Sequence, residues 1–395
     1  MVYTVALSEE GEVFAWGGLN AREHQINNNK VGDNRVGGVE IFGARAVQVA
    51  AGGWHAAVLT ADGVLWTWGD GAAGRLGHGD ERKRVMPTKL GPEMFGGYTV
   101  VMVAAGSFHT LLVTTDGEAW SFGWGLFGQQ GQGDKEDRLI PTKVGAYRFG
   151  GAKIVMVAAG MGHSLAVTGD GVLWTWGCAF HGCLGHDDET ERSVPEKLAP
   201  ELFDDSSVVL VSAGAAHSVA VTLDGALWAW GNGEFGRLGV GDVCNRLIPT
   251  RVGVDDAFGG SGVLLAACGD KHTLAVTNDG TLWSWGRGER GELGHNDRAM
   301  RIIPRRVDAH HFDGAKVVAT AGTQFACFKG TQVQILTHLP LQPGHFTRLQ
   351  LQKTASSIPG AGGRKAKNRR ALGTRTCKTS TCQRRLLRSK WAALA

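Results

Sequence analysis

One phrase recurs along this chain at a nearly constant interval, and this repetition limits the folds open to it. The phrase reads AAGGWHAAVLTADGVLWTWG at residues 50–69 and returns four more times with small changes. Its histidines follow one another at intervals of 54, 54, 54 and 55 residues. A period of this length indicates an array of supersecondary units rather than two or three independent domains. The histidines are His55, His109, His163, His217 and His272.

Each unit predicts three consecutive β-strands. The run at 100–106 is apolar throughout, as expected of a buried inner strand, and residues 109–114 continue as a second strand. An Asp-Gly pair then predicts a hairpin turn, because glycine takes a positive φ without steric cost. Aromatic residues two positions apart on the third strand point to one face and can fill the wedge between sheets. The repeated positions are the turn glycines Gly63, Gly117, Gly171, Gly225 and Gly280 and the aromatics Trp66, Trp120, Trp174, Trp228 and Trp283.

A second repeated phrase follows each hairpin and completes the unit. At residues 74–90 it reads GRLGHGDERKRVMPTKL, with an arginine four residues after the aspartate and a proline three residues further on. Proline cannot donate to a sheet ladder, so this segment is predicted to be the outermost of four strands in a blade. A charge-assisted hydrogen bond between the aspartate and the arginine can order the loop. The aspartates are Asp80, Asp134, Asp188, Asp242 and Asp297.

Composition supports this interpretation. The chain has 60 glycines without a Gly-X-Y period, and 43% of its residues are hydrophobic, which excludes collagen and general disorder. No apolar stretch has membrane-spanning length, and the first residues lack the basic and apolar segments of a secretory signal. Seven cysteines without a CxxC pair indicate reduced thiols. We therefore expect a cytoplasmic or nuclear protein that does not bind membranes.

Taken together, the two phrases resemble the regulator of chromosome condensation repeat family. The pattern GxxHxxxxTxDGxxWxWG followed by GxLGxGD, Arg and Pro is met five times nearly in full, and the resemblance covers roughly residues 1–328. Kelch repeats have similar periods but lack this outer loop. The resemblance implies an all-β fold, a seven-bladed β-propeller of four-stranded blades, over residues 1–330.

The two ends depart from the family pattern. A sixth repeat begins inside its unit at residues 3–17, and another begins at 321–328 and stops, so the last blade is expected to be incomplete or altered. Residues 315–321 could supply the inner strand of the blade begun at Tyr3, which would close six blades; a seven-bladed protein with altered ends is the alternative. Residues 17–42 lack the LG turn and the proline, which leaves a variant outer strand or a disturbed stretch.

Nothing in the sequence predicts an enzyme, a metal site or a cofactor. The five repeated histidines lie in different units, whereas a metal requires three or four ligands that converge. No catalytic Ser-His-Asp order, Walker loop or HExxH motif is present. We interpret each histidine first as a structural residue that packs at the inner strand of its blade and bonds a neighbouring loop. The expected function is a protein-interaction scaffold.

The family resemblance implies a second possibility, guanine-nucleotide exchange on a Ran-type small GTPase. Exchange makes no covalent bond, because it arises from coupled binding free energies. On matched positions the partner-surface candidates are the five repeated histidines and the five loop aspartates. Family exchange factors insert a projecting hairpin into one blade, and the unbroken 54-residue step leaves no room for one. Exchange is therefore the alternative hypothesis.

Ultraviolet photoreceptors of the same family place a tryptophan directly after the glycine of the GxxH phrase. This position does not carry tryptophan in any of the five units, which counts against a photoreceptor. It is occupied by Gly53, Ser107, Met161, Ala215 and Asp270.

The last segment, residues 331–395, has a different composition from the repeats. It holds 13 of the 41 Lys and Arg of the chain, all between Arg348 and Lys390, and no acidic residue follows Asp313. Residues 1–330 hold 28 basic and 37 acidic side chains. The tail is expected to be a disordered extension, or sequence foreign to the natural protein. If it is genuine, it suggests nuclear import, contact with nucleic acid or histones, or a chromatin or ubiquitin-system targeting module.

Overall fold

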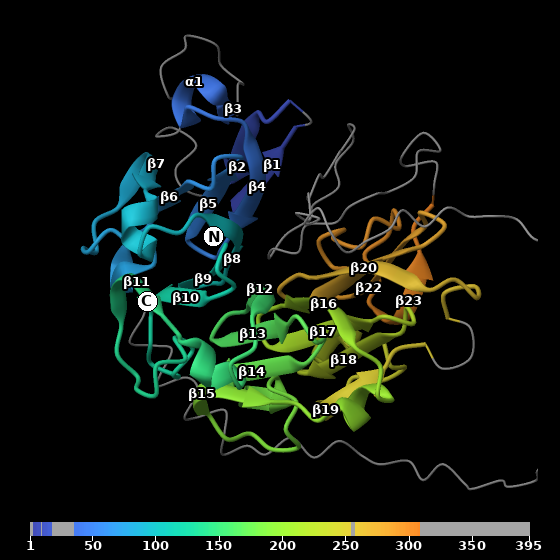
Figure 1. Ribbon diagram of the computed structural model, residues 1–395. Helices are drawn as coiled ribbons and strands as arrows, with labels where there is room; N and C mark the ends of the chain where they lie inside the picture. Colours follow the sequence, from blue (N-terminus) through green and yellow to red (C-terminus); the bar gives the residue numbers. More distant parts are fainter. Residues whose placement is uncertain (1–2, 9, 18–34, 254–256, 309–395) are drawn as a thin grey trace, which may run out of the picture. The chain divides into compact units, whose positions relative to one another are not determined.

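The computed structural model describes residues 3–8, 10–17, 35–253 and 257–308. The chain divides into two units, residues 1–340 and residues 341–395, and every described residue lies in the first. The described residues form one three-stranded sheet and five four-stranded sheets (Figure 1). Each sheet is built from consecutive strands, so each corresponds to one repeat unit. We number these sheets blades 1 to 6 in chain order.

The strands run in the order of the sequence within every blade. Blade 1 contains β1 (Tyr3–Leu7), β2 (Val13–Gly17) and β3 (Arg35–Gly37), and blade 2 contains β4 (Ala46–Ala51), β5 (His55–Thr60), β6 (Leu65–Gly69) and β7 (Arg84–Leu90). Blade 3 contains β8 (Val100–Ala105), β9 (His109–Thr114), β10 (Ala119–Gly123) and β11 (Arg138–Lys143), and blade 4 contains β12 (Ile154–Ala159), β13 (His163–Thr168), β14 (Leu173–Gly177) and β15 (Arg192–Lys197). Blade 5 contains β16 (Val208–Ala213), β17 (His217–Thr222), β18 (Leu227–Gly231) and β19 (Arg246–Arg251), and blade 6 contains β20 (Val263–Cys268), β21 (His272–Thr277), β22 (Leu282–Gly286) and β23 (Arg301–Arg306).

Helical segments are short and lie in the connections. They are α1 (Val39–Phe42) and the 3₁₀ turns η1 (Ala72–Gly74), η2 (Pro92–Phe95), η3 (Ala146–Phe149), η4 (Phe180–Gly182), η5 (Pro200–Phe203) and η6 (Glu234–Gly236). Among the described residues, no helix has the length and apolar character needed to cross a membrane.

The predicted Asp-Gly turns are present in all five complete repeats. In blade 4, Gly171 has a φ of 80°, and the Thr168 hydroxyl donates to Asp170 Oδ1 at 2.5 Å. A Cβ atom on Gly171 would lie 2.5 Å from Cβ of Ser207, so both the backbone and the available space require glycine here. The turn prediction is confirmed.

The proline-containing strands are the outermost strands, as predicted. β7, β11, β15, β19 and β23 each end the strand order of their blade. The preceding blade also covers part of this edge. The Gly79 N–H of blade 2 donates to the Leu139 carbonyl of β11 at 2.8 Å, and Gly133 bonds Ser193 of β15 in the same way at 2.9 Å. Proline and these loop contacts together block pairing with another strand.

The core lies in wedges between consecutive blades, and the paired aromatics fill these wedges as predicted. Between blades 4 and 5, Leu165 and Leu173 of one sheet pack with Trp228 and Trp230 of the next. The Phe203 ring in the connecting 3₁₀ turn meets the Trp228 ring edge-on at 5.7 Å. The same edge-on pairing recurs at the other junctions, in Phe42–Trp66, Phe95–Trp120, Phe149–Trp174 and Phe258–Trp283.

The outer strand of blade 1 departs from the repeat pattern, as the sequence suggested. Its third strand, β3, is only three residues long and contains no proline, and it pairs with β2. A short variant outer strand is therefore present, while residues 18–34 lie outside the described residues. The expected closing strand at 315–321 and the basic tail at 331–395 also lie outside them.

Candidate interaction surface

The five repeated histidines lie at one end of the blades. Each begins the second strand of its blade, directly after the short loop from the inner strand. In blade 2, His55 pairs with Gly69, so the loop of residues 70–83 emerges at the same end. We call this end of blades 2 to 6, with its two loops per blade, the histidine face.

The first four of these histidines each join their own blade to the next one. The His55 side chain is fully buried, and its Nε2 lies 2.8 Å from the Thr110 hydroxyl on β9 of blade 3. Three further pairs repeat this contact at 2.9–3.0 Å: His109–Ser164, His163–Ser218 and His217–Thr273. The partner is thus a strand hydroxyl of the neighbouring blade, where the sequence had suggested a loop. The residue after the histidine supplies this hydroxyl in blades 3 to 6, as Thr110, Ser164, Ser218 and Thr273, whereas Ala56 occupies the position in blade 2.

The hydrogen bonds made by these hydroxyls fix the tautomer of the histidines. The Thr110 hydroxyl donates to the Arg75 carbonyl at 3.0 Å, and Ser164 donates to the Gln129 carbonyl at 2.9 Å. A hydroxyl has one hydrogen, so it accepts from the imidazole, and Nε2 carries the proton of the neutral ring. The Nδ1 atom of His55 is buried without a hydrogen-bond partner in the described part of the chain.

Burial keeps these imidazoles uncharged. Desolvation lowers the pKa of His55 and His109 to about 3 and that of His163 and His272 to about 4. The pKa of His217 is also lowered, chiefly by desolvation and further by nearby Arg237. A fully buried neutral ring offers a partner no surface in this structure. The five histidines therefore serve the arrangement of the face rather than contact at it.

The glycine three residues before each histidine is required by this arrangement. A Cβ atom on Gly52 would lie 2.2 Å from the Gly106 carbonyl oxygen of the next blade and 2.7 Å from Cε1 of His55. The Gly53 N–H donates to the same Gly106 oxygen at 3.2 Å, so the loops of neighbouring blades touch backbone to backbone. Inner-strand ends with small side chains line a narrow hollow here, at Ala51, Gly52, Ala105, Gly106, Ala159, Gly160, Ala213, Gly214 and Cys268.

In blades 4, 5 and 6 the second aromatic of the pair has a polar role that its spacing did not predict. Trp176 Nε1 donates to the Gln129 carbonyl at 2.8 Å, the same oxygen that accepts from Ser164. Two further indoles do the same at 3.0 Å, in Trp230–Cys183 and Trp285–Arg237. In blade 3 the equivalent residue is Phe122, which has no N–H to donate. The strand tryptophans therefore anchor the loop of the preceding blade.

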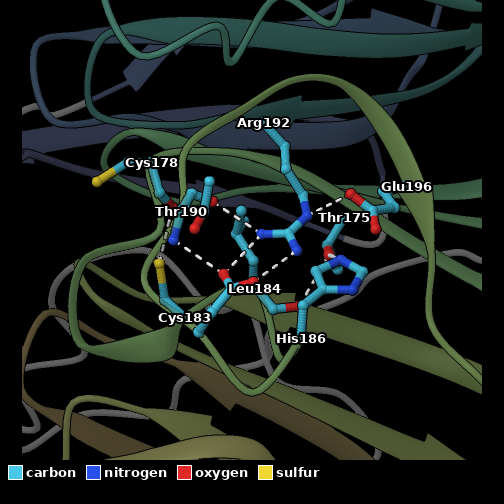
Figure 2. Close-up of polar contacts among 9 residues, drawn as sticks. Thr175, Cys178, Cys183, Leu184, His186, Thr190, Arg192 and Glu196 are labelled. Atoms are coloured by element: carbon cyan, nitrogen blue, oxygen red, sulfur yellow. Dashed lines mark hydrogen bonds and ion pairs between the residues drawn. The ribbon is translucent and has the colours of Figure 1, made fainter.

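The five loop aspartates are engaged in ion pairs within their own loops. In blade 4, Arg192 Nη1 lies 2.9 Å from Asp188 Oδ1 and donates to the Thr190 carbonyl at 2.8 Å, while its Nε pairs with Glu196 (Figure 2). The hydrogen bond from Arg192 lowers the pKa of Asp188 to about 2. The same pairing occurs in Asp80–Arg84, Asp134–Arg138, Asp242–Arg246 and Asp297–Arg301. These carboxylates are half-exposed, but their first partner is the loop arginine.

A second set of histidines, not predicted from the sequence, orders the same loops. In blade 4 the Thr175 hydroxyl donates to the Leu184 carbonyl at 2.8 Å and accepts from His186 Nε2 at 2.9 Å (Figure 2). The same contact is made in His78–Thr67 and His295–Ser284. The sequence signal was the histidine of the LGH phrase, which recurs in three of the five outer loops.

A row of aromatic side chains crosses the loops of the same face, and its two end members remain partly accessible. Phe108, Trp124 and Phe127 form successive edge-on contacts at 5.1 and 5.2 Å across the loops of blade 3. Phe127 then contacts Phe180 of blade 4 at 5.6 Å. Phe108 and Phe180 are half-buried. Sequence analysis missed these residues because they do not recur at every repeat.

Besides Asp187 and Asn296, three loops of this face place a non-glycine residue in left-handed backbone at one equivalent position. Ala73, His181 and Phe235 occupy equivalent positions after the third strand, with φ of 56°, 62° and 64°. Such a conformation is costly for residues other than glycine, and the cost is commonly found at functional sites. None of these residues stood among the sequence candidates, because backbone strain is not visible in a single sequence.

Comparisons with known proteins agree with the repeat pattern. A family model described as RCC1-like domain matches residues 2–253, and two models of the regulator of chromosome condensation (RCC1) repeat match residues 265–292 and 279–328. The chain is 37% identical over 314 residues to the ultraviolet-B receptor UVR8 of Arabidopsis thaliana, which covers 79% of this chain and 69% of UVR8.

Two further likenesses concern a human ligase and a solved structure. The chain is 31% identical over 339 residues to human E3 ubiquitin-protein ligase HERC2, a match that covers 82% of this chain but only 7% of HERC2. The crystal structure of human WBSCR16 is similar with a TM-score of 0.67 and 25% identity, covering 82% of this chain and 83% of that chain.

Proposed function

The chain belongs to the regulator of chromosome condensation (RCC1) repeat family and is a β-propeller, and from this premise we propose that it is a non-catalytic protein-interaction module that binds a partner protein through its histidine face. The observation that carries this proposal is that the residues that hold the loops of that face together differ from the residues that the face leaves exposed. Buried histidines, glycines and tryptophans lock the loops of neighbouring blades together. Other aromatic and cationic side chains of the same loops stay partly exposed.

Surface chemistry supports recognition of a protein rather than a small molecule. The hollow at the centre of the face is lined mainly by alanine and glycine, which offer few groups to orient a ligand. Around it lie half-buried aromatic side chains such as Phe108 and Phe180 and the half-buried cation Lys271. Aromatic residues and arginine are enriched where proteins bind one another. Three strained loop positions, described above, add to this contrast with the regular blades.

Guanine-nucleotide exchange on a small GTPase is the second hypothesis. The hairpin that the family resemblance associates with this activity has no counterpart in blades 2 to 6, where strands recur at a constant step among the described residues. Exchange without such a hairpin would require loop contacts to separate the nucleotide-free from the loaded GTPase. We therefore treat exchange as an outcome to be measured.

Chemical cross-linking of the full chain in a cell extract, followed by mass spectrometry, tests the interaction proposal. Cross-links from partner proteins are expected on loops of the histidine face, such as residues 70–83 and 232–245. Cross-links confined to the opposite Asp-Gly turns would contradict the proposal.

A parallel assay follows release of fluorescent nucleotide from Ran- and Rab-type GTPases. Acceleration for one of them would establish exchange and replace the scaffold function.

Localisation and the tail belong to the same proposal. We place the protein in the cytoplasm or nucleus, with contact to nucleic acid or histones depending on the basic residues after 331. Fluorescent fusions of the full chain, with and without residues 331–395, test this placement. Nuclear accumulation that depends on the tail would support import, and equal distribution of both fusions would remove the argument for it.

A further inference from the structure

Three cations gather around one half-exposed aromatic ring at the junction of blades 5 and 6. The Phe235 ring lies in the loop after β18. Its centroid is 5.1 Å from Lys271 Nζ, 5.7 Å from the guanidinium carbon of Arg237 and 5.9 Å from that of Arg287. These residues come from three separate loops of the histidine face. We call the four residues the Phe235 cluster.

The charge of Arg237, the most buried cation of the Phe235 cluster, is only loosely neutralised. Arg237 is 3% exposed, yet its closest contacts are carbonyl oxygens, with Nε donating to Glu234 O at 2.8 Å and Nη1 to Asp270 O at 3.3 Å. The nearest carboxylate oxygen, Glu234 Oε2, is 3.7 Å from Nη2, and the Glu234 side chain is 65% exposed. Desolvation lowers the pKa of Arg237 to about 10, which reflects this weak compensation.

The other two cations differ in how firmly they are held. Arg287 is fixed by a buried ion pair in which its Nε donates to Glu292 Oε1 at 2.8 Å. Lys271 is half-buried beside Asp270 and has a ring contact but no hydrogen bond or ion pair in the described part of the chain. Of the neighbouring carboxylates, Glu292 therefore holds Arg287 by a direct hydrogen bond, whereas Glu234 forms only a long ion pair with Arg237 at 3.7 Å.

The equivalent arginine of blade 2, Arg75, shows how a more fully neutralised cation lies over a ring, although its ring partner Phe108 occupies the position of Lys271 and not that of Phe235. There Arg75 stands over the Phe108 ring at 5.5 Å, as the single cation, and three carboxylates raise its pKa against the effect of burial: Asp70, Asp137 and Glu81. At the Phe235 cluster, crowded cations, an accessible ring and the left-handed φ of 64° at Phe235 coincide. Crowding of like charges and a strained backbone are both unfavourable, and their occurrence together at one accessible ring indicates a binding function.

We propose that the Phe235 cluster is the docking point for an acidic segment of a partner protein, with a carboxylate side chain beside Lys271 and Arg287 and an apolar side chain against the Phe235 ring. This proposal rests on the proposed function of the histidine face and names the chemistry of the partner. Glu234 supports it from within the chain, because its loosely held carboxylate already approaches Arg237 from the solvent side.

Charge decides between a peptide and a nucleic acid. Residues 1–330 carry 28 basic and 37 acidic side chains, so a long polyanion is repelled by the body as a whole. A cluster of three cations and one ring matches one or two carboxylates with an adjoining apolar residue. It lacks the extended row of cations and stacking rings that single-stranded nucleic acid requires.

The test uses the full chain and a fluorescein-labelled heptapeptide, GDELDEG. A second version of this peptide, with a benzophenone residue in place of the leucine, serves for photo-cross-linking. Fluorescence anisotropy measures affinity, with GNQLNQG as the uncharged control peptide. Lys271→Glu is expected to weaken binding about tenfold or more, the scale of losing a charge pair. Lys153→Glu is the matched control, because Lys153 is exposed beside an Asp-Gly turn at the opposite end of the blades.

A second pair of variants tests the ring. Phe235→Gly removes it without destabilising the fold, and His181→Gly is its control. Phe235→Gly abolishes the aromatic contact and relieves the left-handed backbone, so the melting temperature should hold or rise. His181→Gly relieves the same strain at the equivalent position of blade 4, where φ is 62°, and should leave affinity unchanged. Only Phe235→Gly is expected to weaken peptide binding.

Photo-cross-linking separates this site from binding by the basic tail. Cross-links are expected within residues 232–292, and cross-links found only after residue 331 would overturn the proposal. Equal affinity of the wild type and Lys271→Glu would also overturn it, as would an eight-nucleotide thymidine strand that binds at the cluster more tightly than the peptide. If cellular partners still cross-link to the histidine face of Lys271→Glu and Phe235→Gly, the docking point is wrong while the interaction function stands.

Discussion

At the scale of single residues, the histidine of the repeated phrase is a structural joint. It is neutral and buried, and it donates from Nε2 to a hydroxyl of the next blade. Sequence spacing was sufficient to favour a structural role, because five histidines in five units cannot converge on one metal. The partner could not be predicted, since the hydroxyl lies 55 or 56 residues further along the chain.

His217→Ala should lower the free energy of unfolding by about 1–2 kcal/mol, because the Thr273 hydroxyl loses its buried donor. Urea denaturation measures the change. His181→Ala is the control, since this half-buried loop histidine makes no bond to a neighbouring strand hydroxyl and should cost less than about 0.5 kcal/mol. Unchanged stability of His217→Ala together with lost partner binding would instead make His217 a contact residue.

Two tryptophans of blade 4 should respond oppositely to the loss of their indole N–H. Trp176→Phe removes the donor to the Gln129 carbonyl and should cost about 0.5–1.5 kcal/mol. Trp174 Nε1 is buried without a hydrogen-bond partner, so Trp174→Phe should be neutral or stabilising. Thermal unfolding followed by circular dichroism measures both. A larger loss for Trp174→Phe would show that packing, not hydrogen bonding, governs both positions.

At the scale of elements, strands, turns and edges follow from local pattern and were predictable. The Asp-Gly turn, the paired aromatics and the edge proline each act within one hairpin, so one unit contains all the information needed. The junctions between blades were not predictable, because they combine loops from neighbouring units. Phe235 illustrates this: its three cationic neighbours come from two repeats, and its backbone strain has no sequence signature.

The Asp-Gly turn of blade 4 provides a test at this scale. Gly171→Ala should destabilise by about 1–2 kcal/mol, because alanine is strained at positive φ and its Cβ would meet Ser207. Gly169→Ala, two residues earlier, is the matched control. The nearest atom to its Cβ would be 3.7 Å away, and its φ is not positive, so stability should hold or increase slightly. Equal effects at both glycines, measured by denaturant unfolding, would refute the turn argument.

At the scale of the whole molecule, the buried neutral histidines link stability to pH. The folded-state pKa values of His55, His109, His163 and His272 lie near 3 to 4, below the ordinary value of 6.5, and that of His217 is lowered in the same direction, so the unfolded chain binds more protons in the interval between. Stability is therefore complete above about pH 6.5 and is lost as the pH falls toward 4. Each such histidine contributes roughly 1.4 kcal/mol per pH unit in that interval.

Urea midpoints at pH 7.5, 6.0 and 5.0 check this dependence. We expect the midpoint to fall between the first and last values, and His163→Asn to flatten the decline relative to the wild type. A midpoint that is constant over this range would mean that the histidines are accessible to protons in the folded state.

The closure of blade 1 also belongs to this scale and stays a prediction. Within the described residues, β1 pairs only with β2, whereas the equivalent strands of blades 2 to 6 pair on both sides. If residues 315–321 supply the inner strand, a chain ending at Asp308 should melt at a lower temperature than one ending at Gly330. The full chain serves as the control and should match the longer truncation. Equal melting of all three would exclude this closure.

The histidine–hydroxyl joint has a direction, and this has an evolutionary consequence. Blades 3, 4 and 5 each present an imidazole donor to the blade that follows and a hydroxyl to the blade that precedes, so blades 2 to 6 are joined head to tail by one kind of bond. A duplicate of one of these three units therefore arrives with both halves of the joint. Repeat number can change without compensating substitutions at the new junctions, and novelty is left to the loops that do not repeat.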